Sequence, residues 1–265
     1  MSGPIKILLQ TTIPFTEDDW HVGRFSILRS HLESSRDEAG NALYQIVARD
    51  RETDANGNDK VLSTLDTSDF DELWLFAVDT GDGLSHGDCG AISRFRQRGG
   101  GILSIRDHND LGSSLCTLGG IGAAHYFHSK NPDPDPNRHV RDDQDTKSID
   151  YPNYHSGSNG DYQNIEPVGN VHELLRRTDD SAIEYFPAHP HEGGVGAPPD
   201  DDSARVIATG TSTVTGRDFN LVVAFDESDN RHGNTLGRAI AESSFHHLVD
   251  YNWDTPAPWA VPVPM

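Results

Sequence analysis

Apolar residues along the chain fall into short continuous runs bounded by polar loops, a pattern typical of strands that are buried on both faces of a parallel sheet. The runs predict strands over residues 5–10, 44–48, 73–78 and 102–105. Between them, apolar residues at helical spacing predict helices over residues 25–34 and 88–98, the second capped by Asp88. This alternation predicts an α/β fold with a doubly wound, mostly parallel sheet and helices on both faces.

The second half of the chain departs from this alternation. Residues 115–126 have the composition of a helix, and a shorter helix is predicted over residues 171–177. Further strands, the middle two of them paired, are predicted over residues 183–186, 206–209, 220–225 and 237–245.

A long segment without regular patterning interrupts the chain after residue 125. Residues 131–136 read Asn-Pro-Asp-Pro-Asp-Pro, which excludes a helix or an inner strand, and residues 151–162 are aromatic, polar and glycine-rich. A loop of this length inside a compact domain is usually functional or disordered, and its tyrosines and histidines favour an ordered one. We predict a single domain over residues 1–265 with an inserted loop or lid over residues 125–165.

The stretch from Arg98 to Ser114 is the strongest candidate for the centre of a functional site. The apolar run 102–105 is entered through three glycines and leads into the polar residues Arg106, Asp107, His108, Asn109 and Asp110. A buried strand that delivers polar side chains into a tight turn before a helix is where open α/β folds keep their chemistry. A core strand followed by a solvated loop is the alternative interpretation.

The formal net charge of −21 limits the partners of the chain. A surface this acidic repels nucleic acid and anionic membranes, so we expect neither as a partner and expect a small-molecule substrate instead. A homo-oligomer is left open. Because aspartates are abundant and lysines scarce, we also expect a protein that stays soluble at high salt, in a salt-loving host.

The chain carries no signal for a membrane or for secretion. It has no run of 18 apolar residues, so no transmembrane helix is predicted. Its start passes directly into the first strand without the regions of a signal peptide. Two cysteines, Cys89 and Cys116, are too few for a disulfide framework or a cysteine-rich metal site. We therefore expect a cytoplasmic location.

Three segments together resemble the class I glutamine amidotransferase-like superfamily, in its ThuA-like (trehalose-utilisation) branch. They are the first strand with ILLQTT, the central strand GGGILSI with its sharp turn, and the late strand GRAIAESSFHH that ends in histidine. The resemblance covers most of the chain, and no single motif is specific by itself. It implies a flavodoxin-like sheet, a site beside the turn after Ile105 at the carboxyl ends of the strands, and a substrate related to sugars.

One position departs from the superfamily. Glutamine amidotransferases place a cysteine nucleophile at the turn, and this chain has Arg106 there. A guanidinium cannot be deprotonated in a protein and cannot attack a substrate, so a cysteine-dependent glutaminase is not expected. Cys116 lies inside a predicted helix, where a buried structural thiol is the usual case. Cys89 lies near a helix start, which would lower its pKa, but no base is identifiable beside it.

Polar residues at the predicted strand ends allow acid–base chemistry. His246 or His247 is a candidate base, Asp107 or Asp110 would hold its tautomer, and Arg106 would hold an anionic oxygen. A structural ion pair of Arg106 with Asp107 or Asp110 is the alternative. The catalytic candidates are Arg106, Asp107, His108, His246 and His247.

A second group of candidates suits a metal ion. His189 and His191 stand two apart, on the same side of an extended chain, and Glu192 adds a carboxylate. These ligands fit a divalent transition metal, Zn, Mn or Fe, and no nucleotide cofactor is expected. A surface loop with ordinary histidines is the alternative.

Candidates for substrate binding lie at the tips of predicted strands and in the inserted loop. The turn at residues 81–83 would supply backbone N–H donors where the superfamily has its oxyanion hole, with an ordinary loop as the alternative. The aromatic stretch of the inserted loop would stack against a sugar ring. The set is Gln10, Thr11, Asp79, Gly81, Tyr154, His155 and Asn159.

Two hypotheses of function follow. The first is an enzyme, a hydrolase, isomerase or lyase, that acts on a small polar and sugar-derived molecule by acid–base or metal-assisted chemistry. The second is a ligand-binding or assembly protein on an amidotransferase-like scaffold that has lost its nucleophile. Clustering of Arg106 and the histidines at strand ends within about 8 Å would favour the enzyme, because acid–base partners must come within hydrogen-bond reach.

Overall fold

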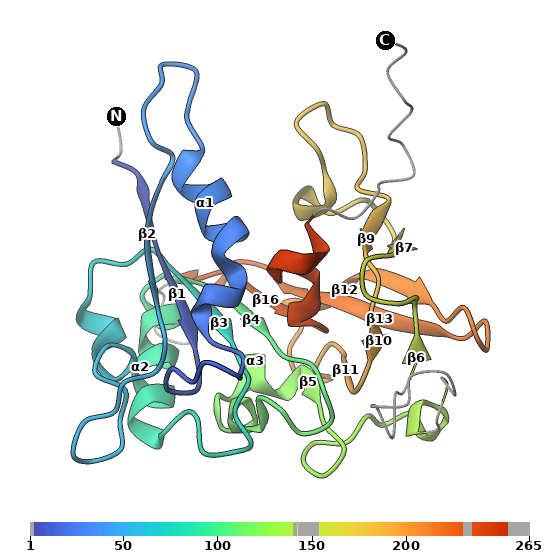
Figure 1. The fold of residues 1–265 in the computed structure, drawn as a ribbon, viewed down its shortest axis with the longest axis horizontal. Helices are drawn as coiled ribbons and strands as arrows, with labels where there is room; N and C mark the ends of the chain where they lie inside the picture. Colours follow the sequence, from blue (N-terminus) through green and yellow to red (C-terminus); the bar gives the residue numbers. More distant parts are fainter. Residues whose placement is uncertain (1–2, 140–141, 143–153, 230–234, 254–265) are drawn as a thin grey trace.

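The computed structural model describes residues 3–139, 142, 154–229 and 235–253, and an eight-stranded sheet organises them (Figure 1). In spatial order its strands are β2 (Tyr44–Arg49), β1 (Ile5–Thr11), β3 (Glu72–Phe76), β4 (Gly101–Ile105), β16 (Ala239–Glu242), β13 (Asp218–Phe225), β12 (Ala204–Thr211) and β8 (Glu166–Pro167). The first five run parallel, in the order of a flavodoxin-like sheet with β16 as its fifth strand. The other three continue the sheet in antiparallel fashion. The predicted fold class is confirmed.

Helices cover both faces of the parallel part. Successive side chains of a strand point to opposite faces, so Ile7 and Leu9 of β1 join one apolar cluster and Leu8 joins another. The first cluster includes residues of α1, and the second includes residues of α2 and of the 3-10 helix η2. The helices are α1 (Ser26–Ser34), preceded by η1 (Val22–Phe25), α2 (His86–Gln97) and η2 (Leu62–Thr67).

Helix α2 begins two residues before the predicted start. Its N-cap is Ser85, whose hydroxyl accepts from the backbone N–H of Asp88 while the Asp88 carboxylate accepts from the backbone N–H of Ser85. Asp88 is therefore the third helical residue of a capping box, which corrects its predicted role as the cap. Among the described residues, no helix has both the length and the apolar composition needed to cross a membrane.

The connection from β4 to β16 holds the second half of the fold. It contains β8, β12 and β13 and four small antiparallel pairs. The pairs are β5 (His125–Tyr126) with β11 (Gly194–Val195), β6 (Tyr154–His155) with β10 (Pro190–His191), β7 (Tyr162–Asn164) with β9 (Tyr185–Pro187), and β14 (Ser228–Asp229) with β15 (Thr235–Leu236). The predicted pairing of 206–209 with 220–225 is confirmed in β12 and β13.

Two predicted helices are shorter than expected. In place of one helix over 115–126 the chain forms η3 (Ser113–Thr117) and α3 (Gly120–Ala123), because Gly119 between them adopts a φ of 79°. The helix expected over 171–177 is reduced to η5 (Glu173–Leu175), since Arg176 is already extended. The final strand ends at Glu242, and the remaining single turns are η4 (Pro136–His139), η6 (Phe245–His247) and η7 (Asp250–Asn252).

The predicted insert over 125–165 is described only in part. Residues 140–141 and 143–153 lie outside the described residues, and with them lies Tyr151 of the aromatic stretch. The described remainder supplies β5, β6 and β7.

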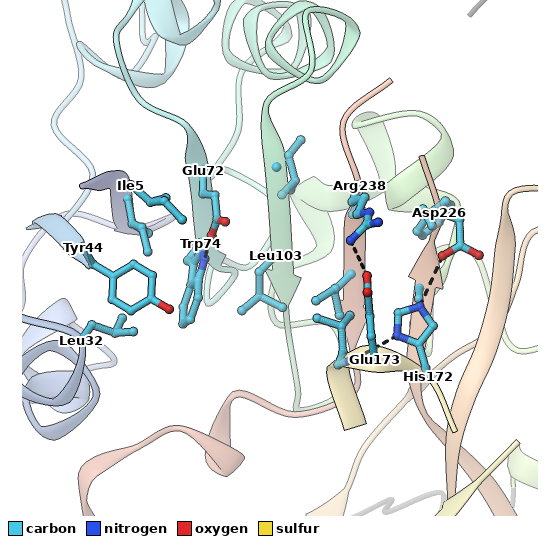
Figure 2. A pocket seen from close by; sticks show the side chains of 18 residues that line it. Ile5, Leu32, Tyr44, Glu72, Trp74, Leu103, His172, Glu173, Asp226 and Arg238 are labelled. Carbon is cyan, nitrogen blue, oxygen red and sulfur yellow. Dashed lines mark hydrogen bonds and ion pairs between the residues drawn. The ribbon is translucent and has the colours of Figure 1, made fainter. Parts of the chain in front are cut away.

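An apolar groove of about 340 Å³ lies at the amino ends of the parallel strands, where Ile5, Glu72, Gly101 and Ala239 begin β1, β3, β4 and β16. Figure 2 shows Tyr44, Trp74 and Leu103 along it, with an Arg238–Glu173 ion pair near one end. Sites in open α/β sheets lie at the opposite, carboxyl ends of the strands. A functional site is therefore expected at the carboxyl ends of the parallel strands.

Candidate metal centre at the carboxyl ends of the strands

Four side chains from three segments meet just beyond the carboxyl ends of β4 and β16. Asp107 and His108 follow β4, His189 precedes β10, and His246 lies in η6 after β16. Each offers one ligand atom, and these four atoms all lie within 4.8 Å of one another. We call these four residues the Asp–His cluster.

One carboxylate oxygen is the centre of the Asp–His cluster. Oδ2 of Asp107 lies 2.7 Å from Nδ1 of His108, 2.8 Å from Nε2 of His189 and 3.3 Å from Nε2 of His246. The rings of His189 and His246 stack with their centroids 3.5 Å apart. Three imidazole nitrogens thus converge on a single oxygen, and the four ligand atoms lie close enough together to hold a metal ion.

Burial controls the charge of the Asp–His cluster. Burial alone would raise the pKa of Asp107, but the imidazoles of His189 and His108 hold it well below its usual range. Burial, together with neighbouring imidazoles, lowers the pKa of His189 and brings that of His246 to about 3. Burial also opposes the charge of His108, but the Asp107 carboxylate outweighs it and raises the pKa of His108. At neutral pH the cluster therefore holds one carboxylate and two neutral, buried imidazoles.

Two further side chains contact the outer nitrogens of the cluster. Oδ1 of Asn159 lies 2.8 Å from Nδ1 of His189, and the Tyr251 hydroxyl hydrogen-bonds Nδ1 of His246. Trp20 and Phe245 pack against His246, with ring centroids 4.9 and 4.7 Å away. His108 is the most exposed member, with 27 % of its side chain accessible, so the cluster opens to solvent on its side.

Arg106 has a role that sequence reasoning missed. The guanidinium is fully buried and uses all five of its N–H groups on backbone carbonyls, those of His108, Asn109, Leu111, Tyr126 and Glu192. Its plane lies over the ring of Phe127, 4.3 Å from the centroid. Because no donor remains, Arg106 can neither hold a substrate oxygen nor form the alternative ion pair through a free N–H group. The structure corrects both expectations: Arg106 ties together the turn after β4 and the segment that carries His189.

The backbone around Arg106 is adapted to this clamp. Gly193 has a φ of 95°, and a Cβ there would lie 1.9 Å from Nη1 of Arg106, so only glycine fits. Asn109, whose carbonyl Arg106 binds, adopts a φ of 42°, an uncommon value for a residue with a side chain. The strained backbone of this turn is therefore at Asn109 and not at Arg106, the position that aligns with the nucleophile of the superfamily.

The predicted metal set of His189, His191 and Glu192 does not come together as a group. His189 joins the Asp–His cluster, but His191 points to a neighbouring network in which Nε2 of His191 and Nε2 of His247 both face the Gln163 amide, at 3.4 and 3.0 Å. Glu192 is not among the four residues whose ligand atoms converge. The prediction assumed an extended chain in which the side chains of His189 and His191 point to the same side. The strand β10 is only two residues long and does not include His189, so this pattern does not hold here. Asp107, His108 and His246 take the expected places of His191 and Glu192.

The two late histidines divide between the two networks. His246 belongs to the Asp–His cluster, whereas Nδ1 of His247 hydrogen-bonds the carboxylate of Glu242 at the end of β16. Burial raises the pKa of Glu242 despite this contact. The sequence leaves open whether His246 or His247 is the relevant residue, and the structure gives the two different surroundings. The ring centroid of His246 lies 3.5 Å from that of His189, and the ring centroid of His247 lies 5.3 Å from that of His191.

Four of the substrate-binding candidates are engaged inside the protein. Gln10 hydrogen-bonds Asp59 at 3.0 Å, and Thr11 hydrogen-bonds Asp50 at 2.7 Å. The Asp79 carboxylate accepts from the Ser114 hydroxyl and backbone, and from the backbone N–H of Gly81, which is thereby occupied. These residues hold the strand tips together and leave no free donor at Gly81 for an oxyanion.

The other three candidates lie nearer the Asp–His cluster. Asn159 contacts His189 directly. Tyr154 is buried, stacks on Phe219 with centroids 3.8 Å apart, and lies 4.9 Å from His191. His155 pairs with Pro190 across β6 and β10 and lines a separate polar cavity.

Neither cysteine has the environment of a nucleophile. Cys89 is buried beside Thr117, 3.1 Å away, and burial raises its pKa. Burial likewise raises the pKa of Cys116. The expected lowering at the helix start is overturned for Cys89, because desolvation disfavours the thiolate more than the helix favours it.

Comparison with known proteins finds similarity in fold only. No family model matches the chain, and no curated protein does. Among solved structures, the N-terminal domain of mmIFT52 matches with a TM-score of 0.51 and 12 % identity, over 92 % of this chain and 88 % of that one. A putative ThuA-like protein from Bacteroides uniformis matches at 0.48 and 10 %, over 92 % and 83 %. The glutaminase domain of CTP synthase from Trypanosoma brucei, solved with bound acivicin, matches at 0.49 and 15 %, over 95 % and 89 %.

The likeness is one of fold. The match to the mmIFT52 N-terminal domain, with a TM-score above 0.5, shows a shared fold. At these identities the likeness says nothing about chemistry.

Three residues near the Asp–His cluster, Tyr251, Glu242 and Gln163, are not among the candidates from the sequence. Tyr251 lies five positions after His246 and Glu242 ends the last strand, so closeness to a strand end is a signal that could have identified both. Gln163 stands in the short strand β7 of the insert, where nothing in the pattern marks it.

A buried histidine below the site makes the stability of the fold depend on pH. Nε2 of His125 lies 2.9 Å from the Ser104 hydroxyl, and its Nδ1 has no hydrogen-bond partner among the described residues. Burial lowers the pKa of His125 to about 3, helped by the Arg106 cation. In the unfolded chain this histidine has a pKa of about 6.5, so between about pH 6.5 and 3 it is protonated in the unfolded state and neutral in the folded state. The free energy of unfolding therefore decreases as the pH falls through this range.

Replacing His125 with glutamine, which keeps a donor for Ser104, is expected to remove this loss. Between pH 6 and 4.5 the wild type should lose about 1.4 kcal/mol per pH unit more than His125→Gln, the value for one proton. Urea unfolding of both proteins in the presence of a chelator measures the difference. Equal slopes would contradict the assignment of a neutral, buried His125.

Proposed function

We propose that the chain is a metal-dependent enzyme that acts on a small polar substrate through one divalent transition metal held by the Asp–His cluster. The observation that supports this is the convergence of four ligand atoms within 4.8 Å from residues as far apart in sequence as His108 and His246. Burying a carboxylate costs free energy unless it is paired, hydrogen-bonded or bound to a metal. Perturbed pKa values in such a group are typical of functional sites.

The donor set fits a metal ion. Imidazole nitrogens with one carboxylate suit Zn, Mn or Fe. Oδ1 of Asp107 is buried and has no hydrogen-bond partner among the described residues, so the carboxylate has accepting capacity that a cation would use. Bound there, a metal would polarise a substrate oxygen or acidify a water molecule.

The surrounding residues would confine the substrate to one side. Trp20 and Phe245 pack on His246 and keep water from that side of the Asp–His cluster. The partly exposed imidazole of His108 borders the open side, from which a substrate would reach the metal. Hydrolysis, isomerisation and elimination are the reaction classes that this arrangement serves.

The chemistry of a neighbouring cavity supports a hydroxylated substrate. A cavity of about 700 Å³ is lined mainly by polar side chains, among them Ser156, Tyr162, Gln163, Thr211 and Thr213. Ser156 hydrogen-bonds the backbone of His189, so a single layer separates this cavity from the Asp–His cluster. Hydroxyl and amide groups around an exposed tyrosine suit a sugar-derived molecule, with residues 155–164 of the insert as one wall.

A second candidate function is a non-catalytic ligand-binding protein on the same scaffold. It is favoured by Arg106, which occupies the place of a nucleophile and serves only to hold backbone carbonyls, and by the raised thiol pKa values. This protein would hold a ligand in the polar cavity without a metal.

The metal content of the purified protein, prepared without a histidine tag, separates the two functions. We expect about one equivalent of a transition metal in the wild type, and its loss in His189→Ala, since that imidazole contacts both Asp107 and His246. Elemental analysis after dialysis measures it. His86→Ala, at an exposed histidine of α2, is the matched control and should retain the metal.

A wild type that remains free of metal after incubation with Zn²⁺, Mn²⁺ and Fe²⁺ would overturn the proposal. Equal metal content in the wild type and His189→Ala would place the metal elsewhere on the chain.

A further inference from the structure

We infer that Asn159 and Tyr251 are positioning residues of the metal centre, each holding one histidine of the Asp–His cluster in the tautomer whose Nε2 binds the metal. The inference rests on the proposed metal site. It assigns a role to a residue of the inserted segment and to one of the last described turn, neither of which touches the metal.

The contact of Asn159 determines which nitrogen of His189 carries the proton. Oδ1 of Asn159 is an acceptor, and it lies 2.8 Å from Nδ1 of His189. Nε2 of the same ring is directed at Asp107, 2.8 Å away, so with a metal on Nε2 the ring would donate its Nδ1 proton to Asn159.

Tyr251 holds His246 in the same way from the opposite side. Its hydroxyl hydrogen-bonds Nδ1 of His246, while Nε2 of that ring lies 3.3 Å from the same oxygen of Asp107. The phenol oxygen can accept the Nδ1 proton of His246, which leaves Nε2 of that ring for the metal. Metal-binding histidines characteristically donate their second nitrogen to such a partner, which fixes the ring and strengthens the ligand.

The two positioning residues are tied to each other through a third side chain. Asn252 donates to the backbone carbonyl of His246 and accepts from the backbone N–H of Gly160, next to Asn159. The loop that carries Asn159 and the turn that carries Tyr251 are therefore held in one register. His189 and His246, stacked between them, keep both Nε2 atoms on the same oxygen.

Neither residue is needed for the core, which makes the inference testable. Asn159 is exposed, and 48 % of Tyr251 is exposed although its hydroxyl reaches a buried ring. Removing the hydroxyl in Tyr251→Phe, or the acceptor in Asn159→Leu, should leave the fold intact.

The experiment measures the dissociation constants of Zn²⁺ and Mn²⁺ by competition with a chromophoric chelator, using the full chain. Tyr251→Phe and Asn159→Leu are each expected to weaken binding about 10- to 100-fold, the usual effect of losing such a partner. Asn159→Asp keeps an acceptor oxygen at this position and should bind the metal ions at least as tightly as the wild type. Tyr44→Phe, at the amino ends of the strands, and Asn56→Leu, at an exposed loop residue, are the matched controls and should bind like the wild type.

A second readout separates positioning from a merely structural effect. The visible spectrum of the Co²⁺-loaded protein should change in Tyr251→Phe and Asn159→Leu, while the unfolding midpoint of the metal-free variants stays at the wild-type value. Unchanged affinities and spectra, in a wild type that binds metal, would overturn the inference and leave the proposed function standing. A wild type that binds no metal would overturn both.

Discussion

Asp107→Asn is expected to abolish metal binding, with a loss of affinity of at least about 100-fold, more than the loss of an outer partner causes. Asp107 is the anionic member of the Asp–His cluster, and one of its oxygens lies within 3.3 Å of all three imidazoles. Asparagine has the same shape but brings no charge, and its amide oxygen is a weaker ligand for a cation than a carboxylate. The divalent cation would then meet only neutral ligands.

Chelator competition with the wild type, Asp107→Asn and Asp110→Asn tests this expectation. Asp110 stands in the same turn, but its carboxylate accepts from the backbone of Ser129 and lies outside the group of converging ligands. Asp110→Asn should therefore bind metal like the wild type. Retention of wild-type affinity in Asp107→Asn would exclude the Asp–His cluster as the metal site.

Arg106→Lys is expected to destabilise the fold by about 3–5 kcal/mol. The guanidinium donates to five backbone carbonyls, and an ammonium with three donors on a flexible stem reaches fewer of them. Each buried carbonyl left without a partner costs about 1–3 kcal/mol. Burial lowers the pKa of Arg106 only to about 10, so the native side chain is still a cation at neutral pH.

Urea unfolding of Arg106→Lys and of Arg29→Lys gives the comparison. Arg29 forms an exposed pair with Glu33 on α1, and its replacement should change stability by less than about 0.5 kcal/mol. The same small change in Arg106→Lys would show that the five contacts do not hold the turn.

The parallel half of the fold could be predicted because its signal is local. β1, β3 and β4 appear in the sequence as continuous apolar runs, and a strand buried on both faces requires such a run wherever the rest of the chain lies. Helix α2 is recognisable from its spacing, although its cap was misassigned to Asp88 because Ser85 and Asp88 both have capping side chains. The region 115–126 was misjudged because helical composition did not outweigh the glycines at 119, 120 and 122.

The site could be predicted in its location but not in its membership. The turn after β4 was recognised from its polar residues, and Asp107, His108, His189 and His246 were all among the candidates. The sequence separated them into a catalytic set and a metal set because His189 stands beside His191 and Glu192 along the chain. In the structure His189 lies 2.8 Å from Asp107, 82 positions away.

The sequence by itself determined the alternation of strands and helices, the parallel sheet and the edge of the sheet at which polar side chains gather. These properties follow from hydrophobic periodicity and turn composition, which act between neighbours along the chain. Only the tertiary structure decided that Arg106 holds carbonyls, that His246 and His247 face different partners, and that three imidazoles meet one carboxylate oxygen. Such choices depend on which segments the order of strands brings side by side, and this long-range packing leaves no trace in the spacing of residues.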